Sequence, residues 1–306
     1  MKTIMIAGAT SMLGSALCGA LLRQGYSVIA IVRENCEKLD RLPAAGELRI
    51  VRCDMENYDA LTEKVTERID AAVAFAWNGT RGAERNQEQL QQRNYQCNVA
   101  YLHACQALGC RTFLTAGSQA EYGLWTSPEK TGETAPCRPN TEYGRYKLKF
   151  YEYAAQYCAL QGIRLVEPRF FSLYGPNDYP GTLVMSMLNR MRENLPCELT
   201  ECVQQWDFLY IDDAVRALVL LLEREDAEGI YHLGYGESAP LKTFVEQMVQ
   251  LTGSASRLCY GAVAYPETGI VNVNPDVSRL KRLGWKPLVS FPEGIRSILN
   301  HQDRKM

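Results

Sequence analysis

The sequence has little of what marks metal, nucleic-acid or membrane proteins. It has only three histidines in 306 residues, and its eleven cysteines form neither a Cys-x-x-Cys pair nor a Cys/His cluster. An odd number of cysteines in so long a chain favours free thiols in a reducing cytoplasm, and we expect no metal. The net charge of −2 supplies no field for nucleic acid. No apolar run approaches the about 18 residues of a membrane span, and no signal-cleavage pattern follows the N-terminus. We therefore expect a cytoplasmic protein with no nucleic-acid or membrane partner.

Strand-like runs alternate with helical patterns from the first residue onward. The expected strands are Thr3–Ala7, Ser27–Val32, Leu48–Arg52, Ala71–Ala76, Thr112–Ala116 and Ile163–Glu167, and the expected helices are Leu13–Gln24, Tyr58–Glu67, Glu88–Leu108 and the segment around Tyr143. Near-continuous apolar strands between helices are typical of a parallel sheet buried on both faces. The sequence therefore predicts an α/β fold with a Rossmann-type, doubly wound parallel sheet.

The regular alternation stops after Arg169, where the turn-rich segment Tyr174–Pro180 begins. We expect an NAD(P)-binding domain at 1–170 and a smaller C-terminal substrate-binding lobe at 171–306. A helix within about 207–224 is expected to pack back on the first domain.

A glycine-bearing turn joins the first strand to the first helix, in the stretch IAGATSMLGSAL. A dinucleotide pyrophosphate binds at such a helix N-terminus, where free N–H groups point at it. Gly8 allows the tight turn, Gly14 allows close helix–strand contact, and Ser11 stands where a third glycine is often found. The candidate cofactor-binding residues here are Gly8, Thr10, Ser11, Met12, Leu13 and Gly14, with Ala76 at the end of the fourth strand.

Two charged residues at strand ends bear on which dinucleotide binds. Arg33 ends the second strand, where binders of unphosphorylated ribose usually present a carboxylate, and a guanidinium suits a 2′-phosphate. Arg33 therefore favours NADP(H) over NAD, although Glu34 beside it leaves a solvated surface arginine as the alternative. Asp54 ends the third strand and either accepts a hydrogen bond from the adenine amine or is an ordinary loop residue.

Tyr143 and Lys147 lie four residues apart in the stretch TEYGRYKLKF and so share one face of a helix. With 17 tyrosines in the chain, this spacing alone is close to a chance occurrence. Tyr146 shares the helix but has no lysine four residues on.

Several motifs in order together resemble the extended short-chain dehydrogenase/reductase family, in its nucleotide-sugar epimerase, dehydratase and 4-ketoreductase branch. The matching segments are GATSMLGSAL, AGSQAEYG, YGRYK, RFFSLYGPND, WDFLYIDDAV and RLKRLGWKP. The resemblance spans essentially the whole chain. It implies that Ser118, Tyr143 and Lys147 are catalytic, that Tyr143 exchanges a proton with a sugar hydroxyl, and that Lys147 lowers the pKa of Tyr143. It also implies that Tyr143 and Lys147 contact the cofactor.

Departures from the family pattern reduce the number of reactions that the protein is expected to catalyse. Gln119 and Ala120 stand where dehydratases carry an Asp-Glu pair, and no histidine fits a 3,5-epimerase motif. The remaining interpretations are NADPH-dependent reduction of a 4-keto nucleotide-diphosphate sugar in deoxysugar biosynthesis, which we favour, and 4-epimerisation. A non-catalytic, NADP-binding regulatory protein is a third interpretation.

The candidate residues for binding the substrate, a nucleotide-diphosphate sugar, are Trp77, Gln119, Ser172 and Trp206. Trp77 follows the fourth strand and either flanks the nicotinamide pocket or belongs to the structural packing. Trp206 replaces a diphosphate-binding arginine of the family, so it either stacks on a base or belongs to the core. Arg138, Arg145 and Arg190 are the candidates to replace that arginine. The family also implies a homodimer through the helices at about 88–108 and 142–160.

Overall fold

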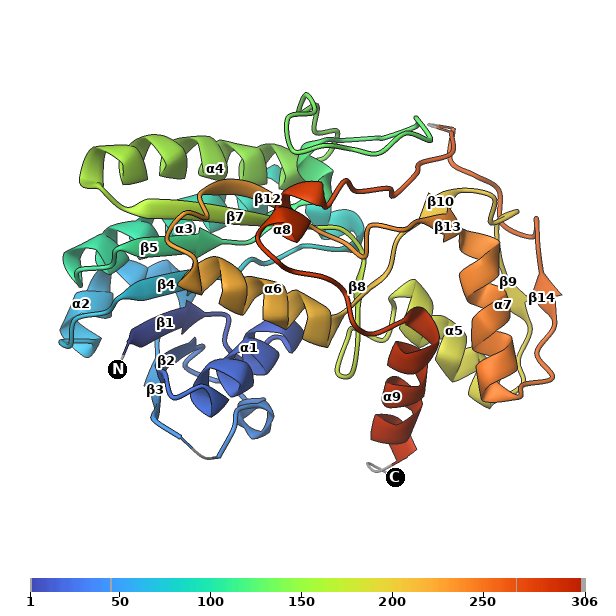
Figure 1. Cartoon of the computed structure of the whole chain (residues 1–306), viewed down its shortest axis with the longest axis horizontal. Coiled ribbons are helices and arrows are strands. Elements are labelled where there is room, and N and C mark those ends of the chain that lie inside the picture. The colour runs from blue at the N-terminus through green and yellow to red at the C-terminus, as the bar shows by residue number, and fades with distance from the viewer. Residues whose placement is uncertain (1, 45, 268, 304–306) are drawn as a thin grey trace. The chain divides into compact units, whose positions relative to one another are not determined.

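The computed structural model describes residues 2–44, 46–267 and 269–303 and divides into two compact units (Figure 1). The first unit comprises Met1–Gly123, Ala135–Phe170 and Val215–Tyr231, and the second comprises Leu124–Thr134, Phe171–Ala214 and His232–Met306. One division falls between Phe170 and Phe171. The insertion 124–134 belongs to the second unit, and the segment 215–231 returns to the first.

The first unit is built on a sheet with strand order β12-β7-β5-β4-β1-β2-β3, and β6 pairs with β7. Its strands are β1 (Thr3–Ala7), β2 (Ser27–Val32), β3 (Leu48–Arg52), β4 (Ala71–Ala74), β5 (Thr112–Thr115), β6 (Gly117–Ser118), β7 (Arg164–Phe170) and β12 (Gly229–Leu233). Strands β1 to β5 and β7 pair in parallel, for example with Thr3 opposite Ser27 and Ile4 opposite Ala71. The order reverses between β1 and β4, and ligands of such sheets bind beyond the carboxyl ends of the strands at this point.

Helices cover both faces of this sheet. They are α1 (Met12–Arg23), α2 (Leu61–Lys64), α3 (Glu88–Ala107), α4 (Glu142–Gln161) and α6 (Ile211–Glu223). In Figure 1, α4 lies above the sheet and α1 and α6 lie below it. A buried apolar core joins the strands to α3 and α4, with Tyr101, Phe113 and Phe150 at most 1% exposed. The helix expected at Tyr58–Glu67 is shorter, because a 3-10 segment, η2 (Met55–Ala60), replaces its first turn and Val65 is already extended.

The second unit contains short strands and helices around an aromatic core. Its elements are β8 (Leu173–Tyr174), α5 (Leu183–Arg192), β9 (Cys197–Glu198), β10 (Gln205–Trp206), β11 (Leu209–Tyr210), β13 (Ala239–Pro240), α7 (Leu241–Thr252), β14 (Leu258–Cys259), α8 (Ser278–Arg282) and α9 (Phe291–Asp303). The rings of Tyr174, Phe208, Phe244 and Phe291 pack with centroids 4.9 to 5.8 Å apart. Edge-to-face contacts of this kind stabilise a small core beyond its buried area.

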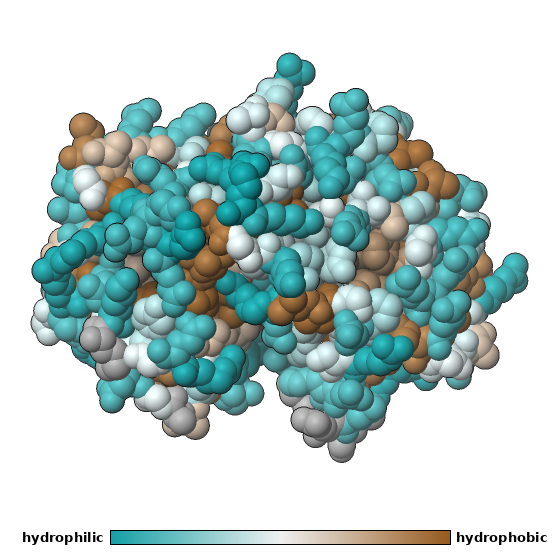
Figure 2. Space-filling model, viewed as in Figure 1, coloured by the Kyte–Doolittle hydropathy of each residue, from teal (hydrophilic) through white to brown (hydrophobic). Residues whose placement is uncertain are grey.

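No helix among the described residues is long and apolar enough to cross a membrane. The exposed face in Figure 2 is mostly hydrophilic, with scattered apolar residues.

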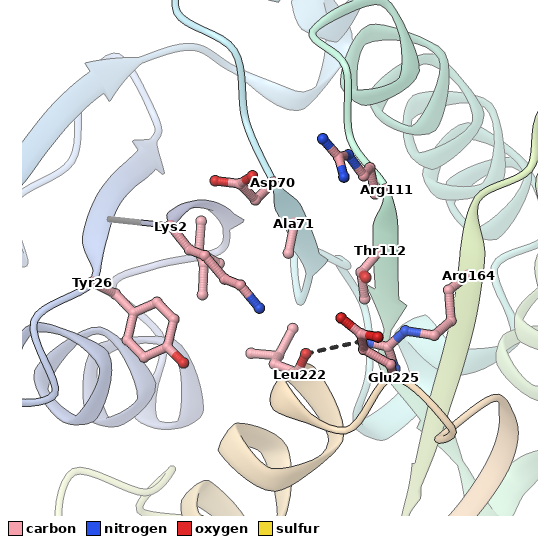
Figure 3. Close-up of a pocket in the computed structure, with 10 residues that line it drawn as sticks. Lys2, Tyr26, Asp70, Ala71, Arg111, Thr112, Arg164, Leu222 and Glu225 are labelled. Atoms are coloured by element: carbon pink, nitrogen blue, oxygen red, sulfur yellow. Dashed lines mark hydrogen bonds between the residues drawn. The ribbon is translucent and has the colours of Figure 1, made fainter.

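The amino ends of the strands form a small pocket in which Arg164 has a structural role (Figure 3). The Arg164 guanidinium donates to the carbonyls of Leu221 at 2.9 Å, Leu222 at 2.9 Å and Ala227 at 2.6 Å. The last carbonyls of a helix have no partner within the helix. Arg164 therefore fastens the end of α6 to the start of β7.

Replacing Arg164 with Met tests this contact. We expect the free energy of unfolding to fall by about 2 to 3 kcal/mol, because buried carbonyls lose charged donors. Urea unfolding followed by circular dichroism measures the change. Arg224→Met is the matched control, because Arg224 is exposed and pairs with the exposed Asp226, and it should leave the unfolding midpoint unchanged. Equal effects of the two substitutions would contradict the assigned role.

Candidate active site

The start of α4 carries two of the predicted catalytic residues close to the end of β6. The Thr141 hydroxyl caps the helix by accepting from the Gly144 N–H at 3.1 Å. A Cβ atom on Gly144 would lie 2.3 Å from the Ala120 carbonyl oxygen, so only glycine permits this approach. The cap and the glycine together bring the first turns of α4 against the segment that follows Ser118.

Lys147 is buried, with 5% of its surface exposed. Its Nζ donates to the Ala116 carbonyl at 2.8 Å and lies 3.9 Å from the centre of the Trp77 ring. A carbonyl and an aromatic face both favour the charged form of an amine. Burial nevertheless lowers the pKa of Lys147 to about 8, against the opposing influence of Glu121 and Glu167.

Tyr143 lies beside Ser118 and Trp77. The Ser118 hydroxyl favours the ionised form of the Tyr143 phenol and so acts to lower its pKa, and the Trp77 and Tyr143 rings meet edge to face at 6.3 Å. The structure therefore brings together Ser118, Tyr143, Lys147 and Trp77 at the carboxyl edge of the sheet. Gln119 follows Ser118 directly, at the start of the 3-10 turn η4 (Gln119–Glu121).

The expected effect of Lys147 on Tyr143 is not what the structure shows. Burial raises the pKa of Tyr143, and the groups that oppose this rise are the Ser118 hydroxyl, Arg85 and Arg81, while Glu121 adds to it. The prediction of a lowered pKa is therefore corrected, because desolvation of the phenolate outweighs the neighbouring positive charge. The phenol is consequently protonated at neutral pH and can act as a proton donor.

Arg85 is a site residue that the sequence does not predict, and its guanidinium carbon lies 5.1 Å from the centre of the Tyr143 ring. Arg85 belongs to the 3-10 segment η3 (Gly82–Asn86), and its buried Nε has no hydrogen-bond partner among the described residues. No spacing in the sequence marks this residue, because only the fold brings its loop over α4. The buried ion pair of Glu121 and Arg169 is likewise not predicted from the sequence, although both residues stand within the family-like motifs AGSQAEYG and RFFSLYGPND.

The glycine turn has the backbone geometry that a pyrophosphate requires. Gly8 adopts φ +79°, and a Cβ on it would lie 2.9 Å from the Ala76 nitrogen, so Gly8 and Ala76 are in close contact. A Cβ on Gly14 would lie 2.2 Å from the Gly8 oxygen. Ser11 caps α1 by accepting from the Gly14 N–H at 3.0 Å.

Thr10, Met12 and Leu13 complete this turn and the first turn of α1, which carries no acidic residue. The free N–H groups of this helix end suit an anion. The residues present therefore fit the pyrophosphate of a dinucleotide.

The surroundings of Arg33 suit a phosphorylated ribose. Glu34, which could otherwise accept from ribose hydroxyls, is paired with Lys64 at 2.8 Å. Arg33 is exposed, and no described residue is a hydrogen-bond or ion-pair partner of its side chain. Asp54 Oδ1 accepts from the Glu34 N–H at 3.1 Å, so Asp54 shapes the turn that presents Arg33. A second guanidinium, that of Arg41, reaches the Thr10 carbonyl at 3.5 Å.

The remaining substrate candidates, Ser172 and Trp206, belong to the second unit. Trp206 is half-buried in β10, and its buried indole nitrogen has no partner among the described residues. Of the proposed replacements for the missing arginine, Arg145 is paired with Glu142, and Arg190 donates to the Pro196 carbonyl at 2.7 Å. No group of three or more metal-ligating side chains occurs within the described part of the chain.

Comparison with known proteins agrees with the resemblance seen in the sequence. The chain is 27% identical to a CDP-abequose synthase of Salmonella muenchen over 99% of this chain and 98% of that protein. It is 26% identical to a dTDP-6-deoxy-L-talose 4-dehydrogenase (NAD(P)(+)) of Kitasatospora kifunensis, covering 98% and 95%.

Solved structures confirm the predicted Rossmann-type fold. A UDP-glucose 4-epimerase of Thermotoga maritima with UDP-glucose matches with a TM-score of 0.87, 20% identity and 99% coverage of both chains. One of Thermus thermophilus in complex with NAD matches with a TM-score of 0.86 and 22% identity, covering 99% of this chain and 100% of that one. The model of the NAD dependent epimerase/dehydratase family matches residues 4–234. The chain belongs to the NAD-dependent epimerase/dehydratase family.

Proposed function

We propose that the protein reduces the 4-keto group of a nucleotide-diphosphate sugar, with NADPH as the cofactor. The observation that carries this proposal is the buried Tyr143 phenol beside Ser118, whose raised pKa keeps it protonated at neutral pH. A carbonyl reduction needs a proton donor at the oxygen, whereas an alcohol oxidation needs a base there. The Kitasatospora relative, named as a 4-dehydrogenase of a dTDP-deoxysugar, supports chemistry at the same carbon.

Each residue of the site has a distinct part in this reaction. The Ser118 hydroxyl and the Tyr143 phenol would hold the ketone oxygen between them, and Tyr143 would pass its proton to that oxygen as negative charge develops. The Lys147 ammonium, one helical turn away, would stabilise the phenolate that remains. Bound NADPH supplies the hydride. Trp77 closes one side of this site, held by its Nε1 donating to Gln91 Oε1 at 2.8 Å.

We propose the second unit as the substrate lobe, because the substrate candidates Ser172 and Trp206 belong to it. The partly exposed ring of Trp206 can stack on a nucleotide base. Eleven free cysteines, nine of them buried, are consistent with the reducing cytoplasm that we propose as the protein's location.

A 4-epimerase would use the same residues, and the fold matches those of solved UDP-glucose 4-epimerases. 4-Epimerisation is therefore the second candidate function. The two functions differ in what happens to added cofactor. The purified protein should consume NADPH in proportion to a 4-keto-6-deoxy sugar nucleotide and form one reduced product. A protein that retains NAD, consumes no NADPH and interconverts two sugar nucleotides would be an epimerase. A protein that binds NADP(H) but turns over no sugar nucleotide would be a regulatory protein.

Tyr143→Phe tests the proton donor. We expect kcat for keto-sugar reduction to fall by about 10²- to 10⁴-fold, because the phenolic proton is lost. NADPH binding, followed by fluorescence, should persist. Tyr146→Phe is the matched control, since this neighbouring phenol on α4 packs near Tyr95 and Lys149 instead, and it should retain activity. Comparable losses in both variants would refute the assignment of Tyr143.

Arg33→Ala tests the choice of NADP(H). Removing a guanidinium from a phosphate should raise the KM for NADPH about 10- to 100-fold, the equivalent of one charged hydrogen bond. The KM for NADH, which lacks that phosphate, should not change. Arg49→Ala serves as the control, because Arg49 pairs with Glu67 elsewhere on the surface. An unchanged preference for NADPH in Arg33→Ala would show that Arg33 does not read the phosphate.

We also propose a homodimer through an aromatic face on α3 and α4. His103 Nε2 lies 2.6 Å from the Tyr153 hydroxyl, and the Tyr153 and Tyr157 rings stack at 6.0 Å. Leu160, in the last turn of α4, is 83% exposed. Partly exposed aromatic residues beside an exposed leucine are typical of protein interfaces.

Tyr157→Arg should break this dimer by placing an unpaired charge in the interface. Light scattering coupled to gel filtration should show a dimer for the unmodified protein and a monomer for the variant. Leu288→Arg is the control, because Leu288 is 59% exposed in the second unit and should leave the dimer intact. A monomer before substitution, or a dimer after it, would disprove this interface.

A further inference from the structure

A group of charged side chains lies fully buried beside Ser118 and Lys147. Glu121 is 0% exposed, and Glu167 and Arg169 are each 1% exposed. Glu167 and Arg169 are two residues apart in β7 and therefore point to the same face of the sheet. Burying charged side chains in a core costs free energy unless they are paired with opposite charges.

Arg169 joins the two carboxyl groups. Its Nη2 lies 2.7 Å from Glu121 Oε2, and its Nε lies 3.3 Å from Glu167 Oε2. Its third nitrogen, Nη1, is 3.3 Å from the Cys137 sulfur, and the guanidinium carbon is 4.6 Å from the centre of the Tyr122 ring. Arg169 is thus held on several sides and has little freedom to move.

Gly117 shows that the chain makes room for this cluster. A Cβ on Gly117 would lie 2.7 Å from Arg169 Cγ and 2.8 Å from Glu167 Cγ. Any side chain at this position would displace the two charged residues. Because Gly117 immediately precedes Ser118, the charged cluster packs directly against the backbone of the site.

Glu121 also connects the cluster to the site directly. Its Oε1 accepts from the Ser118 N–H at 2.7 Å, and the Ser118 Oγ accepts from the Ala120 N–H at 3.2 Å. This reciprocal capping arrangement fixes the backbone and the hydroxyl of Ser118. The charged groups that act on Lys147 are Glu121 from η4 and Glu167 from β7, both paired with Arg169, and Tyr143 lies one turn earlier on its own helix.

Ionisation of both carboxyl groups is unfavourable. Burial raises the pKa of each, and two carboxylates held by one guanidinium repel each other. Glu121 is closer to Arg169 and also accepts from the Ser118 N–H, so charge is better stabilised on Glu121, whereas burial and the charge of Glu121 raise the pKa of Glu167 well above its ordinary value. The proton shared by the pair therefore belongs on Glu167.

We propose that Glu121, held by Arg169 and by a protonated Glu167, is a positioning residue that fixes Ser118 and supplies the counter-charge that keeps Lys147 an ammonium. This inference rests on the proposed reduction, in which Lys147 must remain charged. It makes Glu121 and Glu167 chemically unlike, although both are buried glutamates that contact the same guanidinium.

Glutamine substitutions distinguish the two glutamates, since glutamine keeps the shape and removes only the charge. The pKa of Lys147 is measured from its side-chain carbon resonance in lysine-labelled protein, assigned with Lys147→Met. We expect about 8 in the unmodified protein. In Glu121→Gln we expect the pKa of Lys147 to fall, because Glu121 is the stronger of the two carboxyl influences on the amine and a charge on Glu167 replaces it only in part. The alkaline limb of kcat/KM for keto-sugar reduction should move by the same amount.

Glu167→Gln is the matched variant and should move the Lys147 titration by less than about 0.3 pH unit, because Glu167 carries no charge to lose. An equal fall in both variants, or none in Glu121→Gln, would overturn the proposal. The NMR titration needs no turnover, so it remains decisive even if the protein reduces no keto sugar.

Infrared spectroscopy covers the case in which Glu121→Gln fails to fold. The unmodified protein at neutral pH should show a protonated carboxyl band that disappears in Glu167→Gln. Absence of this band would also overturn the proposal.

Discussion

The burial of the Lys147 ammonium is the constraint on which the catalytic geometry depends. A lone charge in the core is unfavourable, and here it is offset by the Ala116 carbonyl, the face of Trp77 and the neighbouring carboxyl groups. These contacts draw α4 onto the ends of β4 and β5. Tyr143, one turn earlier on the same helix, is thereby placed against Ser118.

The two edges of the sheet serve different purposes. At the amino ends of the strands, Arg164 ties α6 to β7 and stabilises the fold. At the carboxyl ends, Gly8 and Gly14 permit the close backbone packing of the glycine turn, and the charged and aromatic side chains are those of the candidate site. Parallel strands direct all their carboxyl ends to one edge, so residues from distant parts of the chain meet there.

Local sequence patterns predict the fold class and several residues of the candidate site. The glycine turn and the Tyr143–Lys147 spacing lie within single elements, and strand alternation gave the fold class. The pKa of Tyr143 was predicted wrongly, because burial depends on what other segments cover the phenol. Arg85 and the Glu121–Arg169 ion pair could not be derived either, since each joins segments far apart in the chain. The roles of Gln119, Ser172 and Trp206 in substrate binding stay predictions.

The most direct test of keto-sugar reduction follows the hydrogen atom itself. NADPH carrying deuterium at the transferable position is incubated with the protein and a 4-keto-6-deoxy sugar nucleotide, and the product is examined by mass spectrometry and NMR. We expect one deuterium on C4 of the sugar for each NADPH oxidised. A product without deuterium, or sugar turnover without NADPH oxidation, would contradict reduction as the function.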